Sequence, residues 1–213
     1  MDKKRGHRDK ILIERFNEED LDELLKVVHY SLNSYILGGS KVVEGLKSLY
    51  SPESVMEKFE DPLTEIWVAK HKFKGMRGVM SLSEYFQDPN RNLGNVESEG
   101  SFEKGGSIDF DQGGLEIKMF YGINGDSFNK LLSKAKQRTL EKGLTYLSGR
   151  VIESGWKGFE SRGGRDGKLY ISDPFKVYEI NQNNFEEFSL EVRYFNFVHN
   201  SIKEIEKYSC LMC

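Results

Sequence analysis

The segment Ile123–Phe128 is the part of the sequence best suited to bind an anion. Before it, apolar residues occupy alternate positions from Leu115 to Ile123, which predicts a β-strand. Asn124–Asp126 interrupts the strand, and either Asp126 or Ser127 can cap a following helix, whose apolar face is Leu131, Leu132, Ala135 and Leu140. The first N–H groups of a helix lack partners within it, so this turn is a candidate site for an anionic group such as a pyrophosphate.

The elements around this turn form a strand–helix–strand unit. Gly143 stands where a left-handed residue would end the helix, and Leu144–Val151 reads as a second strand. A strand, a helix and a strand of these lengths are typical of a right-handed crossover between parallel strands. The unit therefore predicts that the turn after Ile123 opens where two parallel strands separate.

Patterns before this unit predict a strand and helix, a variable helical region, and a hairpin. Ile11–Ile13 is a short strand, and the acidic run Asn17–Asp20 opens a helix. Val42–Leu49 has helical periodicity, and Ser51–Asp61 begins with a serine cap and a proline. Glu65–Ser83 reads as two strands joined by a turn at a glycine.

The remainder of the chain predicts one long loop and several short elements. Gln87–Gly106 has no apolar periodicity, so it is either disordered or a mobile lid, and its composition favours disorder. Glu153–Gly164 reads as a short helix that ends in glycines. Lys168–Ile171, Phe175–Ile180 and Leu190–Val198 read as strands.

The composition bounds the classes of partner and compartment. The chain has 213 residues, and its charges nearly cancel at −3, so bulk charge gives no reason to expect a nucleic-acid partner. Residues 1–10 are basic, lack a following apolar run, and are expected to be a flexible tail and not a secretory signal. No apolar run is long enough to span a membrane. The scarcity of cysteine fits a reducing, cytoplasmic location.

Histidine and cysteine offer no clear catalytic or metal centre. His29 and His71 have no serine, cysteine or carboxylate at a telling spacing, so we interpret both as structural. No cluster has the spacing of metal ligands, and we expect no metal. Cys210 and Cys213 form either half of a metal or redox site, a prenylation box, or a frayed end, of which we favour the frayed end.

The order of these elements resembles the core of the GCN5-related N-acetyltransferase (GNAT) superfamily. Three passages carry the resemblance: the strand and acidic helix start of Ile11–Val28, the hairpin with Trp67-Val68-Ala69, and the crossover that leads to Phe159-Glu160-Ser161-Arg162-Gly163. The last phrase is similar to a "Tyr-Glu-Lys-x-Gly" phrase of the family. The resemblance implies an α/β (α+β) fold, namely a twisted mixed sheet with helices on both faces. It also implies that residues 11–213 form a single domain.

Members of this family transfer an acetyl group from acetyl-CoA to an amine. By resemblance, Glu116 on the fourth strand is the candidate base and Tyr121 the candidate acid. The segment Ser34–Ser51 would cover the amine acceptor, which is either a small molecule or a protein. The residues that would hold the cofactor are Tyr121, Gly122, Ile123, Asn124, Gly125, Asp126, Ser127 and Phe128.

The sequence departs from the family pattern at two places. The pyrophosphate turn lacks the usual Arg or Gln and carries Asp126, whose charge would repel a bound anion by about 1 kcal/mol or more. Lys130 and Lys134 either compensate for that charge or are solvated surface residues. Phe159 replaces the family's tyrosine, so the acid would be one of three others: Tyr121, Tyr146 or Tyr170.

These departures leave three hypotheses open. The first is an acetyl-CoA-dependent N-acetyltransferase. The second is a GNAT-like domain that has lost its chemistry and serves binding or regulation. The third is an unrelated α+β domain whose element order matches by chance, which would lack a parting of the fourth and fifth strands.

Overall fold

The computed structural model describes residues 11–35, 40–85, 113–144, 146–152, 167–171, 173–180 and 183–199. Several predictions lie outside these residues: the tail at 1–10, the loop at 87–106, the helix at 153–164 with Phe159, and the cysteines near the end of the chain. No helix of the described residues is both long enough and apolar enough to cross a membrane.

The described elements follow the predicted order closely. The helices are η1 (Glu18–Asp20), α1 (Leu21–Tyr35), α2 (Ser40–Ser48), α3 (Pro52–Glu60) and α4 (Gly125–Glu141). The strands are β1 (Ile11–Arg15), β2 (Thr64–His71), β3 (Gly75–Tyr85), β4 (Gly114–Gly122), β5 (Tyr146–Ile152), β6 (Gly167–Ile171), β7 (Phe175–Ile180) and β8 (Glu187–His199).

The strands form one mixed sheet with the order β1-β2-β3-β4-β5-β8-β6, and β7 also pairs with β8. Every pair is antiparallel except β4 with β5, which is parallel as the crossover predicts. Val192 of β8 pairs with both Ile152 of β5 and Phe175 of β7, so β7 lies on the edge of β8 away from β5. Phe195 pairs in the same way with β5 and β6, so β6 and β7 follow one another along that edge.

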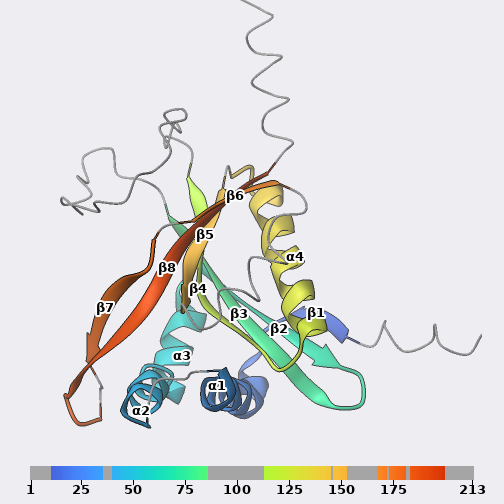
Figure 1. Cartoon of the computed structure of the whole chain (residues 1–213). Coiled ribbons are helices and arrows are strands. Elements are labelled where there is room, and N and C mark those ends of the chain that lie inside the picture. Colours follow the sequence, from blue (N-terminus) through green and yellow to red (C-terminus); the bar gives the residue numbers. More distant parts are fainter. Residues whose placement is uncertain are drawn as a thin grey trace, which may run out of the picture.

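Helices cover both faces of the sheet, as the resemblance implies (Figure 1). One face packs on α4, and its core holds Leu131 and Leu132 of the helix with Met80, Leu82, Leu115 and Leu147 of the strands. The other face packs on α1, α2 and α3, and its core holds Leu24, Val28 and Leu32 with Val68, Val79 and Met119. Because both faces are buried, the central strands carry apolar residues in both phases.

The helix boundaries show which local signals decide them. Ser51 caps α3, since its hydroxyl accepts a hydrogen bond of 3.2 Å from Ser54 N, and Pro52 follows. Gly143 has a φ of +66°, as predicted for the left-handed residue that ends α4. The predicted cap of α4 was wrong. Asn124, and not Asp126 or Ser127, is the cap, because the Asn124 Oδ1 accepts a 2.9 Å hydrogen bond from Ser127 N.

Candidate functional site where β4 and β5 part

The parallel strands β4 and β5 are paired only at their beginnings. The register runs from Gly114–Tyr146 to Ile117–Gly149, and then stops. Beyond it, β5 continues in its pairing with β8, while β4 continues in its pairing with β3 as far as Gly122. Among the described strands, no partner therefore satisfies the β5-facing edge of the β4 backbone after Ile117.

A β-bulge lies at the point where the two strands part. Ser81 of β3 pairs with Met119 and Leu82 pairs with Ile117, so Lys118 is an extra residue in β4. Leu115 and Ile117 belong to the core on the α4 face, whereas Met119 belongs to the core on the α1 face. The sequence prediction of one continuous alternation from Leu115 to Ile123 was therefore wrong about the faces, although it was right about the strand.

The bulge places the two candidate catalytic residues on the same side of the sheet. Glu116 alternates with Leu115 and Ile117 and thus faces away from α4, while Tyr121 packs against the core on the α1 face. Without an extra residue, positions five apart would face opposite sides of a strand. Glu116 forms an ion pair with Lys118, and 22% of the Glu116 side chain is exposed. The partly exposed Glu116 side chain thus lies on the side of the sheet on which α1, α2 and α3 pack.

Tyr121 is held by a second tyrosine that the sequence did not indicate. The rings of Tyr50 and Tyr121 lie 5.5 Å apart at 87°, an edge-to-face contact. Burial raises the pKa of the Tyr121 phenol well above its ordinary value, and the electrostatic interaction and the hydrogen bond with Tyr50 raise it further. Tyr121 therefore keeps its proton at neutral pH, which is the state that a general acid requires.

The turn after β4 leaves two backbone donors at the start of α4. Ile123 N donates to Arg77 O at 2.9 Å, Ser127 N donates to Asn124 Oδ1, and Phe128 N donates to Asn124 O. No described acceptor meets the amides of Gly125 and Asp126. A Cβ on Gly122 would lie 3.2 Å from Ser127 Oγ, so the absence of a side chain lets the strand end close against the helix. Two N–H groups beside the parted strands can thus receive an anion.

No protein-family profile and no curated protein matches the sequence. Solved structures do match over most of their length. A GCN5-related N-acetyltransferase from Rhodopseudomonas palustris has a TM-score of 0.57 at 13% identity, over 89% of this chain and 98% of that chain. A ribosomal-protein-alanine N-acetyltransferase from Brucella melitensis has a TM-score of 0.54 at 13% identity, over 88% and 99%. An N-acetyltransferase from Staphylococcus aureus Mu50 has a TM-score of 0.54 at 12% identity, over 89% and 97%.

The chain has the GNAT fold. At these identities the likeness concerns the fold alone. The parting of β4 and β5, which the hypothesis of a chance match said would be absent, is present.

The lysines of α4 do not compensate for Asp126 within this GNAT fold. Lys130 Nζ donates a 2.7 Å hydrogen bond to Ile11 O, which ties α4 to β1. Lys134 Nζ lies 4.4 Å from the centre of the Trp67 ring. Both side chains are engaged away from the turn, and neither is the freely solvated lysine of the alternative interpretation. Asp126 is exposed in the first turn of α4.

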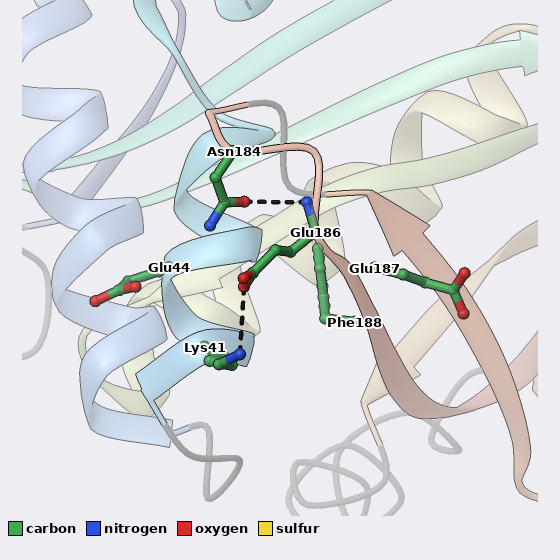
Figure 2. Close-up of a pocket in the computed structure, with 6 residues that line it drawn as sticks. All are labelled: Lys41, Glu44, Asn184, Glu186, Glu187 and Phe188. Atoms are coloured by element: carbon green, nitrogen blue, oxygen red, sulfur yellow. Dashed lines mark hydrogen bonds and ion pairs between the residues drawn. The ribbon is translucent and has the colours of Figure 1, made fainter.

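A small pocket lies on the side of α2, at the turn between β7 and β8 (Figure 2). Its lining is Lys41, Glu44, Asn184, Glu186, Glu187 and Phe188. Lys41 Nζ lies 3.4 Å from Glu186 Oε2, and Glu186 N donates to Asn184 Oδ1 at 3.1 Å. A Cβ on Gly45 would lie 2.4 Å from the Phe188 ring, so α2 approaches β8 closely. The segment predicted to cover the acceptor thus contacts both β8 and, through Tyr50, β4.

Sequence reasoning missed Lys118 and Tyr50 as parts of this site. The sequence does not show that Lys118 is an extra residue. Both faces of the strand are buried, so apolar residues occur at odd and at even positions and the change of face at Lys118 does not interrupt the pattern. Tyr50 follows α2 in the chain, and nothing local relates it to Tyr121. The single available hint was the position of Tyr50 inside the segment assigned to cover the acceptor.

Proposed function

We propose that this protein is an N-acetyltransferase that transfers the acetyl group of acetyl-CoA to an amine. The observation that carries the proposal is the end of β4–β5 pairing at Ile117 and Gly149, beside a helix start with two available amides. A parting of this kind supplies backbone donors for a thioester carbonyl, while the helix start supplies donors for a pyrophosphate. The GNAT fold of the solved acetyltransferases supports the same activity.

In this proposal, Glu116 and Tyr121 divide the proton transfers between them. Glu116 removes a proton from the acceptor amine, and the amine nitrogen then attacks the thioester carbonyl. The C–S bond breaks, Tyr121 donates its proton to the leaving thiolate, and the second proton that the nitrogen loses as the amide forms returns to the Tyr121 oxygen. The protonated state of the Tyr121 phenol and the position of Glu116 on the same side of the sheet support these roles. The residues Tyr121–Phe128 remain the proposed cofactor contacts, no metal is needed for these steps, and a cytoplasmic location remains our expectation.

A binding or regulatory domain without chemistry is the second candidate. Two observations favour it. The Asn124 side chain already accepts the hydrogen bond of the Ser127 amide at the start of α4, and Asp126 carries a negative charge beside the amides of Gly125 and Asp126. Both would weaken the binding of a pyrophosphate. The choice between the candidates therefore depends on whether CoA binds and whether an acetyl group moves.

Thermal unfolding with CoA and a thiol-release assay test the two candidates together. A ligand at a hundredfold excess over its dissociation constant stabilises the folded state by about 2.7 kcal/mol. We expect millimolar CoA to raise the melting temperature. We also expect acetyl-CoA to release free thiol in the presence of a primary amine, a diamine or a peptide with a free N-terminus. Stabilisation without thiol release would favour the domain without chemistry, and absence of both stabilisation and thiol release would contradict the acetyltransferase.

A further inference from the structure

A row of polar residues crosses the sheet from β2 to β5 on the face that carries Glu116. Thr64 of β2 pairs with Ser83 of β3, Ser83 pairs with Glu116 of β4, and Glu116 pairs with Ser148 of β5. Paired residues of neighbouring strands project on the same face, with Cβ atoms about 5 Å apart. The next row along the same face, Ile66, Ser81 and Met119, has one polar member, and the row after it is Val68, Val79 and Tyr121. The row from Thr64 to Ser148 is therefore the one of these three that is polar at every position.

Two hydroxyls of this row, those of Thr64 and Ser83, are hydrogen-bonded to one another, and Thr64 is also hydrogen-bonded to a surface carboxylate. Thr64 Oγ1 lies 2.9 Å from Ser83 Oγ and donates a 2.7 Å hydrogen bond to Asp61 Oδ2. Thr64 is only 8% exposed, whereas Asp61 is exposed. The hydrogen bond from Thr64, followed by the one from Leu63 N, lowers the pKa of Asp61, so Asp61 is ionised and accepts at neutral pH.

The direction of these hydrogen bonds follows from the single proton of each hydroxyl. Thr64 gives its proton to Asp61, so Ser83 must be the donor in the contact between the two hydroxyls. The lone pairs of Ser83 then remain available on the side of its other strand neighbour, Glu116. The Ser83 and Thr64 hydroxyls therefore both donate in the direction from Glu116 toward Asp61.

We propose that Ser83 and Thr64 form a relay that carries the proton of the acceptor amine from Glu116 to Asp61 at the surface. The proposal rests on the proposed function. An ammonium acceptor and acetyl-CoA give an amide, CoA thiol and one proton, which must leave the site. Glu116 takes that proton, Ser83 Oγ accepts it and passes its own to Thr64 Oγ1, Thr64 passes its own to Asp61, and Asp61 releases it to water.

One contact must form for the relay to operate. Among the described residues, the charged group that faces Glu116 is Lys118, and the structure shows this ion pair in place of a hydrogen bond from Glu116 to Ser83. Rotation of the carboxylate away from Lys118, or one water between the two side chains, closes the gap, since the pair is adjacent across the strands.

The variants Thr64→Val and Thr64→Ser test the relay as a matched pair. Valine keeps the shape of threonine and removes the hydroxyl, whereas serine keeps the hydroxyl. Near pH 7, with the best amine of the thiol-release assay, we expect Thr64→Val to lower kcat/KM roughly tenfold, which is less than the roughly 10²- to 10⁴-fold contribution of a general acid or base itself. Thr64→Ser should stay within about twofold of the original chain. Ser83→Ala should reproduce the loss without altering the hydrogen bond to Asp61.

The pH dependence separates a relay from a structural effect. Above the pKa of the amine, about 10 for an alkylamine, the acceptor arrives unprotonated, so Glu116 has no ammonium proton to remove. The loss in Thr64→Val should then disappear. An equal loss at both pH values, or none at either, would overturn the relay while acetyl transfer by the original chain still supports the proposed function. Absence of CoA stabilisation and of thiol release in the original chain would instead overturn the proposed function, and the relay with it.

Discussion

Helix α4 contacts the sheet in two regions of opposite character. Near its C-terminal end, a network of charges ties it to β1, β2 and β3. Glu65 of β2, which is 8% exposed, accepts hydrogen bonds from Arg138 at 2.6 and 2.9 Å and from the Trp67 indole at 3.0 Å. Lys142 and Arg15 approach the same carboxylate at 3.2 and 3.1 Å. At its N-terminal end, the helix begins beside strands that have already parted.

The two regions have different roles: the Glu65 network stabilises the fold, whereas the parted strands leave backbone groups that a ligand can reach. The Glu65 network attaches α4 to the sheet, and both oxygens of the Glu65 carboxylate take part in hydrogen bonds or ion pairs. The β4–β5 region leaves backbone edges and helix amides without partners, which costs stability unless a ligand or water meets them. A domain can maintain such an opening because other contacts hold its walls. Mutations in the network should therefore affect folding, whereas mutations at the opening should affect binding.

Glu65→Ala should give the largest effect on folding. It leaves Arg138, Lys142 and Arg15 without their shared carboxylate, and removal of one partner from a buried ion pair destabilises a protein by about 3 kcal/mol. Urea unfolding measures the loss. Glu141→Ala is the matched control, because Glu141 pairs with the same Arg138 from an exposed position and should leave the midpoint nearly unchanged. Equal effects of the two variants would contradict the contrast.

The same network predicts how stability depends on acid. Burial acts to raise the pKa of Glu65, but hydrogen bonds from Arg138, Trp67 and Lys142 and the charge of Arg15 outweigh it and lower the pKa to about 2 from 4.5. A lowered folded-state pKa means that the stabilisation is present above pH 4.5 and is lost as the pH falls toward 2. Urea unfolding between these pH values should show a smaller acid-dependent loss for Glu65→Gln than for the original chain.

Gly149→Ala should have an intermediate effect, and it acts at the last residue of β5 that pairs with β4. An added Cβ would lie 3.1 Å from Ile117 O and 2.8 Å from the Phe195 ring. We expect a loss of about 1 kcal/mol in the free energy of unfolding, because the ring must move. We also expect weaker binding of CoA, because Ile117 is where the strands part. Unchanged CoA binding would place the ligand away from this junction.

Asp126→Asn should have the smallest effect, and it tests whether the turn at the start of α4 binds CoA. The change removes a negative charge beside the two available amides of α4 and keeps the side-chain shape. Relief of a repulsion of about 1 kcal/mol corresponds to roughly a fivefold gain in CoA affinity. Titration calorimetry with CoA measures it, and Asp22→Asn in the first turn of α1 is the control. An unchanged affinity would show that this turn does not hold the cofactor.

Periodicity in the sequence predicted the strands and helices of this GNAT fold well, because each buried face repeats over many residues. The pairing of β6 and β7 along one edge of β8 was not predicted, since their separate runs carry no information about a shared partner. The candidate site was predicted only in part. The turn after Ile123 was named from local pattern and Glu116 from the family resemblance, whereas Lys118 and Tyr50 depend on register and tertiary contact. The roles of Glu116 and of Tyr121–Phe128 remain predictions.

Lys118 also has a consequence for how this strand could be edited. The side chains before and after it already face the directions that they would have in a regular strand without it: Ile117 toward α4 and Met119 toward α1. Lys118 thus behaves as a single-residue insertion that bends the strand and leaves both cores in frame. A variant that lacks Lys118 should keep the packing of both cores. Its β4 should be straight and should pair with β5 over more residues.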